Sequence, residues 1–331
     1  MVDPGQARLI GLDWGSTSLR AFLIGPDGVL LDQRGSDQGS SAMDGQGARY
    51  AAALADIAGD WMAVRTGAAP LPLIACGMVG SLHGWAQAPY FDCPTELGAL
   101  AHAGVRLAVG KGAMLTIVPG LRCRPSGQPY DVMRGEETQI AGVLAMQPAL
   151  AERSIVVLPG THSKWARIEQ GRVMDFATHM TGELFAVLRA HSVLGRLMPS
   201  EATPGDAVAF DLGVAAARDG AALGLAHQLF AVRTLGLMDE LASAALPDYL
   251  SGLLIGAEVQ AGLTWRAAAG DANAPLALTG EPALCARYAH ALAILGARAP
   301  SLFPNTAPAG LWRIALAGGL LGAGAGASEE I

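Results

Sequence analysis

Charged side chains are scarce in this 331-residue chain: Asp, Glu, Lys and Arg make up 15%, against 51% hydrophobic residues. That balance excludes an intrinsically disordered chain. A long apolar helix is also missing. The longest stretch free of those four residue types, residues 66–91, contains Pro70, Pro72 and Pro89. Because prolines interrupt a helix, we expect no membrane-spanning segment and no membrane partner.

Clusters of basic residues and pairs of cysteines are missing as well. The net charge is −7 and no run of Lys and Arg is present that could follow a phosphate backbone, so a nucleic-acid partner is not expected. The four cysteines form no CxxC pair, which argues against a thiolate zinc site. The first residues, MVDPGQARLI, show no basic region followed by an apolar core, and we therefore expect a cytoplasmic protein.

Two nucleotide-binding signatures are also lacking. No GxxxxGK[ST] run occurs, and no GxGxxG follows a strand. What is present is a repeated pattern. Residues 9–33 are typical of three antiparallel strands joined by two polar turns, and residues 154–177 show the same pattern again. This internal repeat predicts two α/β domains, residues 1–150 and 151–331, with the second mostly helical after Thr181.

The first turn of each repeat is rich in Gly, Ser and Thr, whose backbone N–H groups and hydroxyls suit phosphate oxygens. Such residues are ordinary in turns, but two such turns at equivalent places favour nucleotide binding. Asp13 ends the strand before the first turn, where it is suited to hold Mg²⁺ through water; alone it would be a turn-capping residue. The expected phosphate-binding residues are Gly15, Ser16, Thr17 and Ser18 in the first turn, and Gly160, Thr161, His162, Ser163 and Lys164 in the second.

Two members of the second turn have alternative interpretations. Lys164 can neutralise a phosphate, but a solvated surface lysine fits the pattern equally well. His162 is also consistent with a hydrogen-bonded structural histidine.

An acidic segment, DVMRGEETQ at residues 131–139, precedes the domain boundary and is predicted to begin a helix that runs to about Met146. Phosphoryl transfer to an alcohol needs a carboxylate that accepts the hydroxyl proton. Asp131, Glu136 and Glu137 are candidates, and their spacing does not select among them. The alternative is that both glutamates are first-turn acids favoured by the helix dipole.

The two turn segments, together with a third segment near residue 280, resemble the acetate and sugar kinase, Hsc70 and actin superfamily. LDWGSTSLRA (residues 12–21) resembles its first phosphate motif, LPGTHSKW (158–165) its second, and LALTGEPAL (276–284) its adenosine motif. The resemblance implies two actin-like, ribonuclease H-like α/β domains, each a mixed sheet with flanking helices, hinged about a nucleotide cleft. It also implies an ATP-dependent transferase that uses Mg²⁺, with Gly280 letting the adenosine lie close to the backbone.

Further segments are similar to one branch, the 2-dehydro-3-deoxygalactonokinase family. They are CGMVGSLHGW (76–85), DVMRGEETQI (131–140), GTHSKW (160–165), MTGELF (180–185) and YLSGLLIG (249–256). This resemblance covers residues 9–314. It implies phosphorylation of 2-dehydro-3-deoxy-D-galactonate at its 6-hydroxyl, with the sugar acid and ATP as partners, in galactonate catabolism.

The resemblance also implies roles for single residues. In related sugar kinases the base is an aspartate after a glycine at the start of a helix, and Gly135-Glu136 stands at that place here; Glu136 is therefore ranked first as base and Asp131 second. Arg134 is expected to bind the substrate carboxylate. Ser81, His83 and Glu183 are further expected substrate contacts.

Two other functions fit the same segments. One is a kinase of this fold that acts on another sugar or sugar acid, and the other is a non-catalytic sugar-sensing regulator. The preference between galactonate and gluconate epimers is not encoded in a readable motif. The oligomeric state is also open, and a homodimer is compatible with the sequence.

Overall fold

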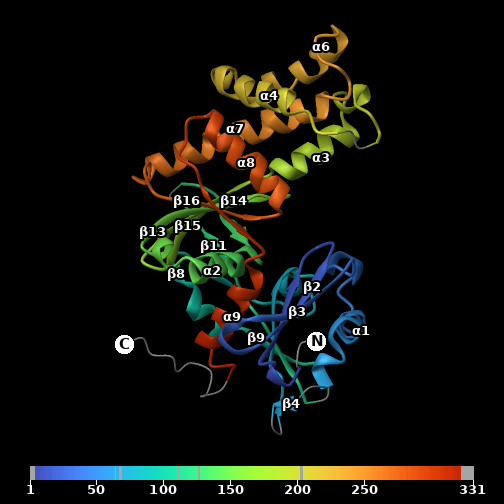
Figure 1. The fold of residues 1–331 in the computed structure, drawn as a ribbon, viewed down its shortest axis with the longest axis vertical. Coiled ribbons are helices and arrows are strands. Elements are labelled where there is room, and N and C mark those ends of the chain that lie inside the picture. Colours follow the sequence, from blue (N-terminus) through green and yellow to red (C-terminus); the bar gives the residue numbers. More distant parts are fainter. Residues whose placement is uncertain are drawn as a thin grey trace. The chain divides into compact units, whose positions relative to one another are not determined.

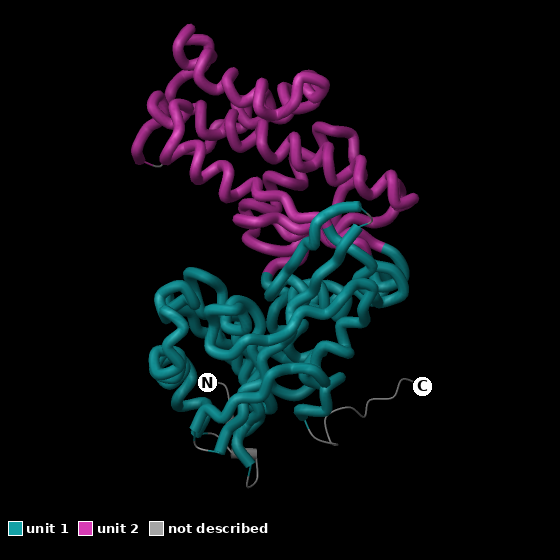
Figure 2. The backbone as a smooth tube through the Cα atoms, turned by 180° about the vertical axis from the view of Figure 1, so that it is seen from behind, with its two compact units in different colours: residues 1–153, 168–176, 305–331 teal, residues 154–167, 177–304 magenta. Residues whose placement is uncertain are grey.

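The computed structural model describes residues 4–63, 65–66, 69–110, 112–125, 127–201 and 204–321. The chain divides into two compact units (Figure 2). Unit 1 comprises residues 1–153, 168–176 and 305–331, and unit 2 comprises residues 154–167 and 177–304. The first passage between units therefore lies near the predicted division at residue 150, but the last helix returns to unit 1 instead of completing a C-terminal domain.

Unit 1 is built on a six-stranded sheet in the order β3-β2-β1-β6-β10-β9. β1 pairs antiparallel with β2 and parallel with β6, as in the ribonuclease H-like fold that was expected. The three antiparallel strands predicted at the start of the chain are confirmed. The strands are β1 (Leu9–Trp14), β2 (Leu19–Ile24), β3 (Leu30–Ser36), β6 (Leu73–Gly77), β9 (Val105–Ala108) and β10 (Met114–Ile117).

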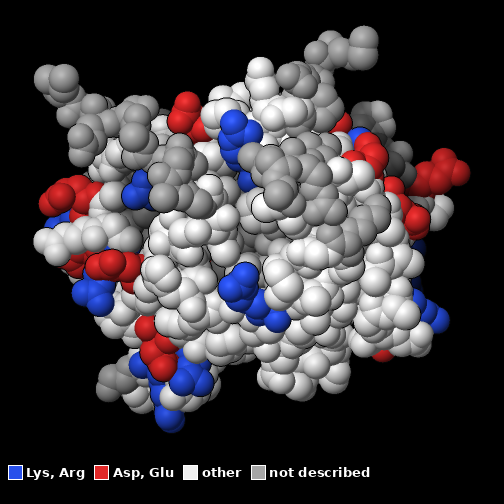
Figure 3. Space-filling model, turned by 90° about the horizontal axis from the view of Figure 1, so that it is seen from below, with Lys and Arg blue, Asp and Glu red and all other residues white. Residues whose placement is uncertain are grey.

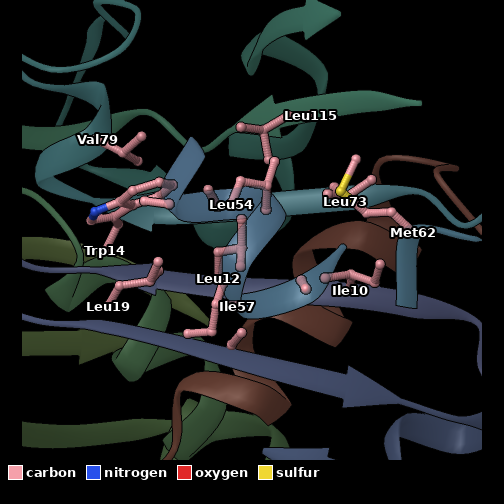
Figure 4. Packing of buried hydrophobic residues seen from close by; sticks show 14 of the residues in the cluster. Ile10, Leu12, Trp14, Leu19, Leu54, Ile57, Met62, Leu73, Val79 and Leu115 are labelled. Carbon is pink, nitrogen blue, oxygen red and sulfur yellow. The ribbon is translucent and has the colours of Figure 1, made fainter. Parts of the chain in front are cut away.

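Helix α1 (Gly47–Ala58) covers one face of this sheet. Tyr50, Leu54 and Ile57 recur at helical spacing and are buried, as the periodicity predicts. They pack on side chains of β1, which include Leu12 and Trp14, in the main core cluster (Figure 4). Burial of such apolar side chains, at about 25 cal/mol per Å², is the main force that holds the sheet and helix together.

A second helical layer of unit 1 pairs α2 (Glu136–Met146) with α9 (Ala307–Ala317), which come from distant parts of the chain. Two glycines allow this close approach. A Cβ on Gly142 would lie 2.0 Å from the Thr306 carbonyl oxygen, and one on Gly310 would lie 1.9 Å from that of Thr138. The remaining strands of unit 1 form smaller pairings: β4 (Arg65–Thr66) with β5 (Ala69–Pro70), and β12 (Asp131–Met133), β11 (Gly120–Cys123) and β7 (Tyr90–Asp92) in a three-stranded sheet, while β8 (Thr95–Glu96) pairs with β15.

The predicted helix start at Asp131 is wrong. Asp131–Met133 is strand β12, which pairs antiparallel with β11, and α2 begins only at Glu136. The reason is Gly135, whose φ of 108° is outside the helical region and redirects the chain between strand and helix.

Unit 2 has the strand order β15-β14-β13-β16-β17, which corresponds to β3-β2-β1-β6-β10 of unit 1. Strands β13, β16 and β17 are parallel. The predicted recurrence of the opening pattern is thus confirmed, and so is the prediction of two α/β units with mixed sheets. The strands are β13 (Arg153–Leu158), β14 (Ser163–Glu169), β15 (Arg172–His179), β16 (Leu276–Gly280) and β17 (Ser301–Pro304); the tip of the β14–β15 hairpin groups with unit 1.

Helices fill the rest of unit 2 (Figure 1). The long helix α7 packs on α4 through Gly213 and Gly252, where a Cβ on either glycine would come within 2.2 Å of a backbone atom of the other helix. The helices are α3 (Thr181–His191), α4 (Ala207–Asp219), α5 (Leu225–Gln228), α6 (Ala231–Leu237), α7 (Leu246–Ala268) and α8 (Pro282–Ile294).

Two surface properties bear on possible partners. Among the helices of the described residues, none combines the length and apolar content needed to cross a bilayer. On the face drawn in Figure 3, the described Lys and Arg side chains lie in separate small groups among uncharged and acidic residues.

Candidate functional site

The first Gly/Ser/Thr turn connects β1 and β2 in unit 1. It is closed by a 2.9 Å hydrogen bond from the Gly15 N–H to the Ser18 carbonyl oxygen. The side chains of Ser16, Thr17 and Ser18 are exposed. Hydroxyl groups on these exposed residues are suited to bind an anion.

A second segment of unit 1 lies directly against this turn. The N–H groups of Ser40 and Ser41 donate to the carbonyl oxygens of Gly15 and Ser16, both at 2.9 Å. Between the two segments there is no room for a side chain at Gly39. The turn is consequently held in one conformation from behind while its hydroxyls face outward.

Asp13 lies at the carboxyl end of β1, beside this turn, and is mostly buried. Its register partner on the parallel strand β6 is Cys76. One carboxylate oxygen accepts an ion-paired hydrogen bond from Arg20, and the other faces the Cys76 thiol at 3.8 Å. Each oxygen keeps a second lone pair, which suits a cation that retains its water shell. Within the described residues, no three His, Cys, Asp or Glu side chains gather as a metal site.

The start of α2 lies at the end of β6, so its carboxylates lie close to this edge of the sheet. A Cβ on Gly135 would be 3.1 Å from the Gly77 Cα, and one on Gly77 would be 2.6 Å from the Trp14 carbonyl oxygen. Glu136 is half-buried, and its Oε2 accepts a 2.9 Å hydrogen bond from the backbone N–H of Arg134. Asp131, in contrast, lies on β12 and accepts from the N–H of Val132.

Glu137, the next residue, is completely buried. Its two oxygens accept hydrogen bonds from the Gly135 N–H at 2.6 Å and the Thr138 hydroxyl at 2.9 Å. Burial, with a smaller effect of the Glu136 charge, raises the pKa of Glu137 to about 7. A side chain without solvent access cannot touch a substrate, so Glu136 is the carboxylate of α2 that can.

His83 of the 77–85 loop lines an open, polar cavity of about 520 Å³ in unit 1. Its other lining residues are Ser40, Ser41, Asp44 and Gly45. Asp44 also forms an ion pair with Arg49 at 2.9 Å. Ser81 belongs to the same loop but not to the lining of this cavity.

An aromatic group supports that loop. Tyr50 and Trp85 stack with ring centroids 5.6 Å apart, and Trp14 meets both rings edge-on. Since Trp14 follows Asp13 directly, the group connects the loop to the end of β1. The sequence analysis did not anticipate this packing.

Arg134 is held on one side by its neighbours. Its Nη2 donates to the Ala88 carbonyl oxygen at 2.8 Å, and its guanidinium stacks 4.3 Å above the Tyr90 ring. Its other guanidinium nitrogens, Nε and Nη1, are buried and have no hydrogen-bond partner among the described residues. In this conformation Arg134 braces the 88–90 segment.

The second Gly/Ser/Thr turn lies in unit 2, between β13 and β14. Thr161 and His162 are exposed, whereas Ser163 and Lys164 are buried. Lys164 Nζ donates to the His162 carbonyl oxygen at 3.1 Å. The turn thus presents its first residues outward and uses its last two inside the unit.

His162 and Glu183, predicted separately, are brought together by the fold. The imidazole Nε2 and the Glu183 carboxylate are 2.5 Å apart, and both side chains are more than 40% exposed. Helix α3 holds this pair against the turn, because the Glu183 N–H donates to the Thr161 carbonyl oxygen at 3.0 Å.

A cavity of about 390 Å³ in unit 2 opens beside the second turn. Its wall contains Gly160 of the turn, Thr181 and Gly182 of α3, and residues of α7 and α8, which include Asp248, Leu284, Arg287 and Tyr288. Arg287 donates to Asp248 at 2.7 Å and lies over the Phe210 ring at 4.3 Å. Gly280 is the last residue of β16. Its φ is 148°, and a Cβ at this position would make a tight contact of 3.3 Å with the Pro159 carbonyl oxygen.

Comparison with known proteins decides the family. A family model described as 2-keto-3-deoxy-galactonokinase matches residues 13–314. The chain belongs to this family. It is therefore a sugar-acid kinase, as the sequence analysis predicted.

Individual relatives agree with that assignment. The kinase is 36% identical over 301 residues to 2-dehydro-3-deoxygalactonokinase of Escherichia coli (strain K12), covering 91% of this chain and 94% of the relative. It is also 36% identical to DgoK1 of Rhizobium meliloti (strain 1021), over 76% and 79% of the two chains. A crystal structure of a Sinorhizobium meliloti protein with the same activity in its name superimposes with a TM-score of 0.80, at 33% identity, over 93% of this chain and 98% of the other.

Several residues around the cavities of this kinase were not singled out from its sequence. They are Ser40, Ser41 and Asp44 in unit 1 and Thr181, Asp248, Arg287 and Tyr288 in unit 2. The family-like segment at 180–185 contains Thr181, and the one at 249–256 directly follows Asp248, so the sequence marked these two positions without indicating a role. Ser40 and Ser41 lie in a polar loop that carries no recognisable motif.

Proposed function

We propose that this kinase transfers the terminal phosphoryl group of ATP to the 6-hydroxyl of 2-dehydro-3-deoxy-D-galactonate in galactonate catabolism. The family match over residues 13–314 carries the proposal, because it includes both glycine-rich turns, the acidic start of α2 and Gly280. The relatives' names supply the substrate. The chemistry is supported by the site geometry described above.

The nucleoside belongs in unit 2 under this proposal. The 390 Å³ cavity has apolar residues such as Phe185 and Leu284 together with Arg287, a combination suited to a purine ring. Gly280, without a side chain, lets the ribose approach the backbone beside it. Thr161 and His162, the exposed first residues of the second turn, lie beside this cavity and are suited to bind the phosphates; the first turn of unit 1 offers exposed hydroxyls of the same kind.

Asp13 is the residue that would hold Mg²⁺, through coordinated water. Bound magnesium would neutralise charge on the phosphate oxygens. Arg20 pairs with one oxygen of the Asp13 carboxylate and so makes direct metal coordination less favourable. Asp13 is therefore suited to contact a hydrated ion through a water molecule.

The acceptor belongs in unit 1. The polar cavity at His83 offers hydroxyls, an imidazole and the Asp44 carboxylate to the hydroxyl groups of a sugar acid. Arg49 does not line this cavity but pairs with its lining residue Asp44, and we propose that its guanidinium binds the substrate carboxylate. Arg134, first predicted for this role, stacks on Tyr90 and keeps two buried nitrogens without a partner among the described residues, so it is the alternative candidate.

Glu136 is the proposed base. As the 6-oxygen bonds to phosphorus and the bond from phosphorus to the bridging oxygen of ADP breaks, the hydroxyl proton passes to the Glu136 carboxylate. A positioned base of this kind contributes roughly 10²–10⁴-fold in rate. We also propose that the protein acts in the cytoplasm.

The direct test is product analysis. The purified protein is incubated with MgATP and 2-dehydro-3-deoxy-D-galactonate, and ADP is quantified while ³¹P and ¹³C NMR locate the new phosphate ester. The proposal requires one ADP per ester and phosphorus coupling to C6. An ester at another carbon, or ADP release without an ester, contradicts it.

A further inference from the structure

A carboxylate of unit 2 that the proposed chemistry does not use lies deep behind the second turn. Glu258 of α7 is 4% exposed. Its Oε1 accepts from the indole Nε1 of Trp165 at 2.9 Å, and its Oε2 accepts from the Tyr288 hydroxyl at 2.5 Å. Among the described residues no Lys or Arg forms an ion pair with it. A buried carboxylate held only by neutral donors is costly, and its position therefore calls for an explanation.

The Glu258 carboxylate fixes the direction of the neighbouring hydrogen bonds. The indole N–H of Trp165 and the hydroxyl of Tyr288 both donate to this carboxylate, so the Tyr288 proton points to Glu258. Burial, together with Glu258, raises the pKa of Tyr288 well above its usual range, which keeps that proton on the phenol. The Tyr288 oxygen is then left as an acceptor.

Two hydroxyl groups close to the proposed nucleotide cavity, those of Ser163 and Thr181, face this acceptor oxygen. Ser163 Oγ lies 2.9 Å from the Tyr288 oxygen, and the Thr181 side chain also hydrogen-bonds to it. Their protons point inward as a result. The Ser163 oxygen in turn accepts the Gly160 N–H at 3.3 Å, so the series runs from the turn to Tyr288 and on to Glu258.

The ends of this series are the two backbone segments that border the 390 Å³ cavity. Gly160 belongs to the turn, and Thr181 begins α3. Gly182 packs so tightly on the turn that a Cβ would lie 2.4 Å from the Gly160 carbonyl oxygen. Any rotation of Ser163 or Thr181 would therefore displace the groups that face a bound nucleotide.

We propose that Glu258 and Tyr288 are positioning residues for nucleotide binding: they orient the Ser163 and Thr181 hydroxyls inward and so fix the second turn and the start of α3. The inference rests on the proposed function, since it takes the second turn as a phosphate site. It also reassigns Ser163, predicted as a direct phosphate contact, to holding the turn from inside.

The test compares nucleotide affinity in folded variants. Glu258→Gln keeps the size of the side chain, but its amide nitrogen donates to Tyr288 and reverses the order of donors. Tyr288→Phe removes the bridge, and Ser163→Ala removes the link to Gly160. Tyr249→Phe is the matched control, because Tyr249 is a mostly buried tyrosine of α7 that does not line the cavity. Calorimetry with ADP, without the sugar acid, gives Kd for each folded variant, and steady-state assays give KM for ATP and for the sugar acid.

We expect about a tenfold or greater rise in Kd for ADP and in KM for ATP in Glu258→Gln, Tyr288→Phe and Ser163→Ala, the scale of one or two lost hydrogen bonds. KM for the sugar acid should stay within twofold, as should every constant of Tyr249→Phe. A purely structural role would lower Tm and leave Kd of the folded protein unchanged.

If Tyr288→Phe does not fold, the other two variants decide. Wild-type Kd values in folded Glu258→Gln and Ser163→Ala would overturn the proposal, and so would an equal loss in Tyr249→Phe. A wild-type protein that binds no ADP or ATP would instead refute the proposed function on which this inference depends.

Discussion

Gly39 lies directly against Thr17: a Cβ on Gly39 would stand 2.3 Å from the Thr17 carbonyl carbon. The backbone of Gly39 is at φ −72° and ψ 168°, where any residue is tolerated, so only space excludes a side chain. The contact joins the first turn to the segment that lines the His83 cavity through Ser40 and Ser41. The proposed phosphate and acceptor sites of unit 1 are therefore built on one packed pair of segments.

Gly39→Ala should displace the first turn and lower kcat/KM for ATP by about 100-fold, the effect expected of a misplaced catalytic geometry. Gly35→Ala is the control, because a Cβ there meets nothing within 4 Å. Steady-state kinetics at saturating sugar acid measure both. Equal kcat/KM in the two variants would show that the contact does not position the turn.

Glu136→Gln should reduce kcat by about 10²–10⁴-fold, since the amide cannot accept the hydroxyl proton. Asp131→Asn should remain within about threefold, because Asp131 lies on β12 and caps the adjacent Val132 N–H. Both are compared at saturating ATP, with substrate binding checked by calorimetry. The reverse order of effects would move the base to Asp131, and activity in both would remove it from this segment.

Arg49→Gln should raise KM for the sugar acid by about tenfold or more while KM for ATP is unchanged, because a charge-assisted hydrogen bond to the substrate carboxylate is lost. Arg122→Gln, which removes another exposed arginine–aspartate pair of unit 1, serves as the control. Initial-rate kinetics with each substrate varied separate the two constants. A change confined to KM for ATP would contradict the placement of the acceptor.

Glu137 should make folding stability depend on pH. Its pKa is about 7 in the folded chain against 4.5 as the ordinary value, so the folded state binds the extra proton between these limits. The stability that this group contributes is complete below pH 4.5 and is lost as the pH rises through 7. Between pH 5 and pH 8 the free energy of unfolding should fall by up to about 3 kcal/mol more in the wild type than in Glu137→Gln.

Urea unfolding at the two pH values measures this difference. Glu152→Gln, which changes an exposed glutamate, should follow the wild type. A parallel pH dependence of the wild type and Glu137→Gln would mean that Glu137 is not the group that titrates.

Much of the fold was predictable because the strand patterns are strong. The opening strands, the recurrence after residue 154 and the strand before Gly280 all carry apolar runs that end in turn residues. The helix start at Asp131 was missed because the acidic run DVMRGEE fits a helix N-terminus as well as a strand. Only the pairing of β12 with β11 and the positive φ of Gly135 distinguish the two.

The site was predictable in part for the same reason. Asp13, the first turn and Glu136 could be proposed from the sequence because they lie in continuous motifs, and their roles remain predictions. Ser163 and Lys164 belong to such a motif but are both buried, because the first four residues of β14 are covered on both faces of the sheet. Tyr288 and Glu258 were not found at all, because their roles arise only where two helices meet the turn.

The central claim is the substrate, and a specificity panel tests it most directly. ADP release with MgATP is measured for 2-dehydro-3-deoxy-D-galactonate, its gluconate epimer, galactonate, glycerol and simple aldoses, and kcat/KM is compared. The account predicts that the first compound exceeds every compound that is not a 2-dehydro-3-deoxy sugar acid by at least about 100-fold, and that it also exceeds the epimer. A higher kcat/KM for galactonate, glycerol or an aldose would contradict it, and no turnover with any compound while ATP binds would favour a sugar-sensing protein instead.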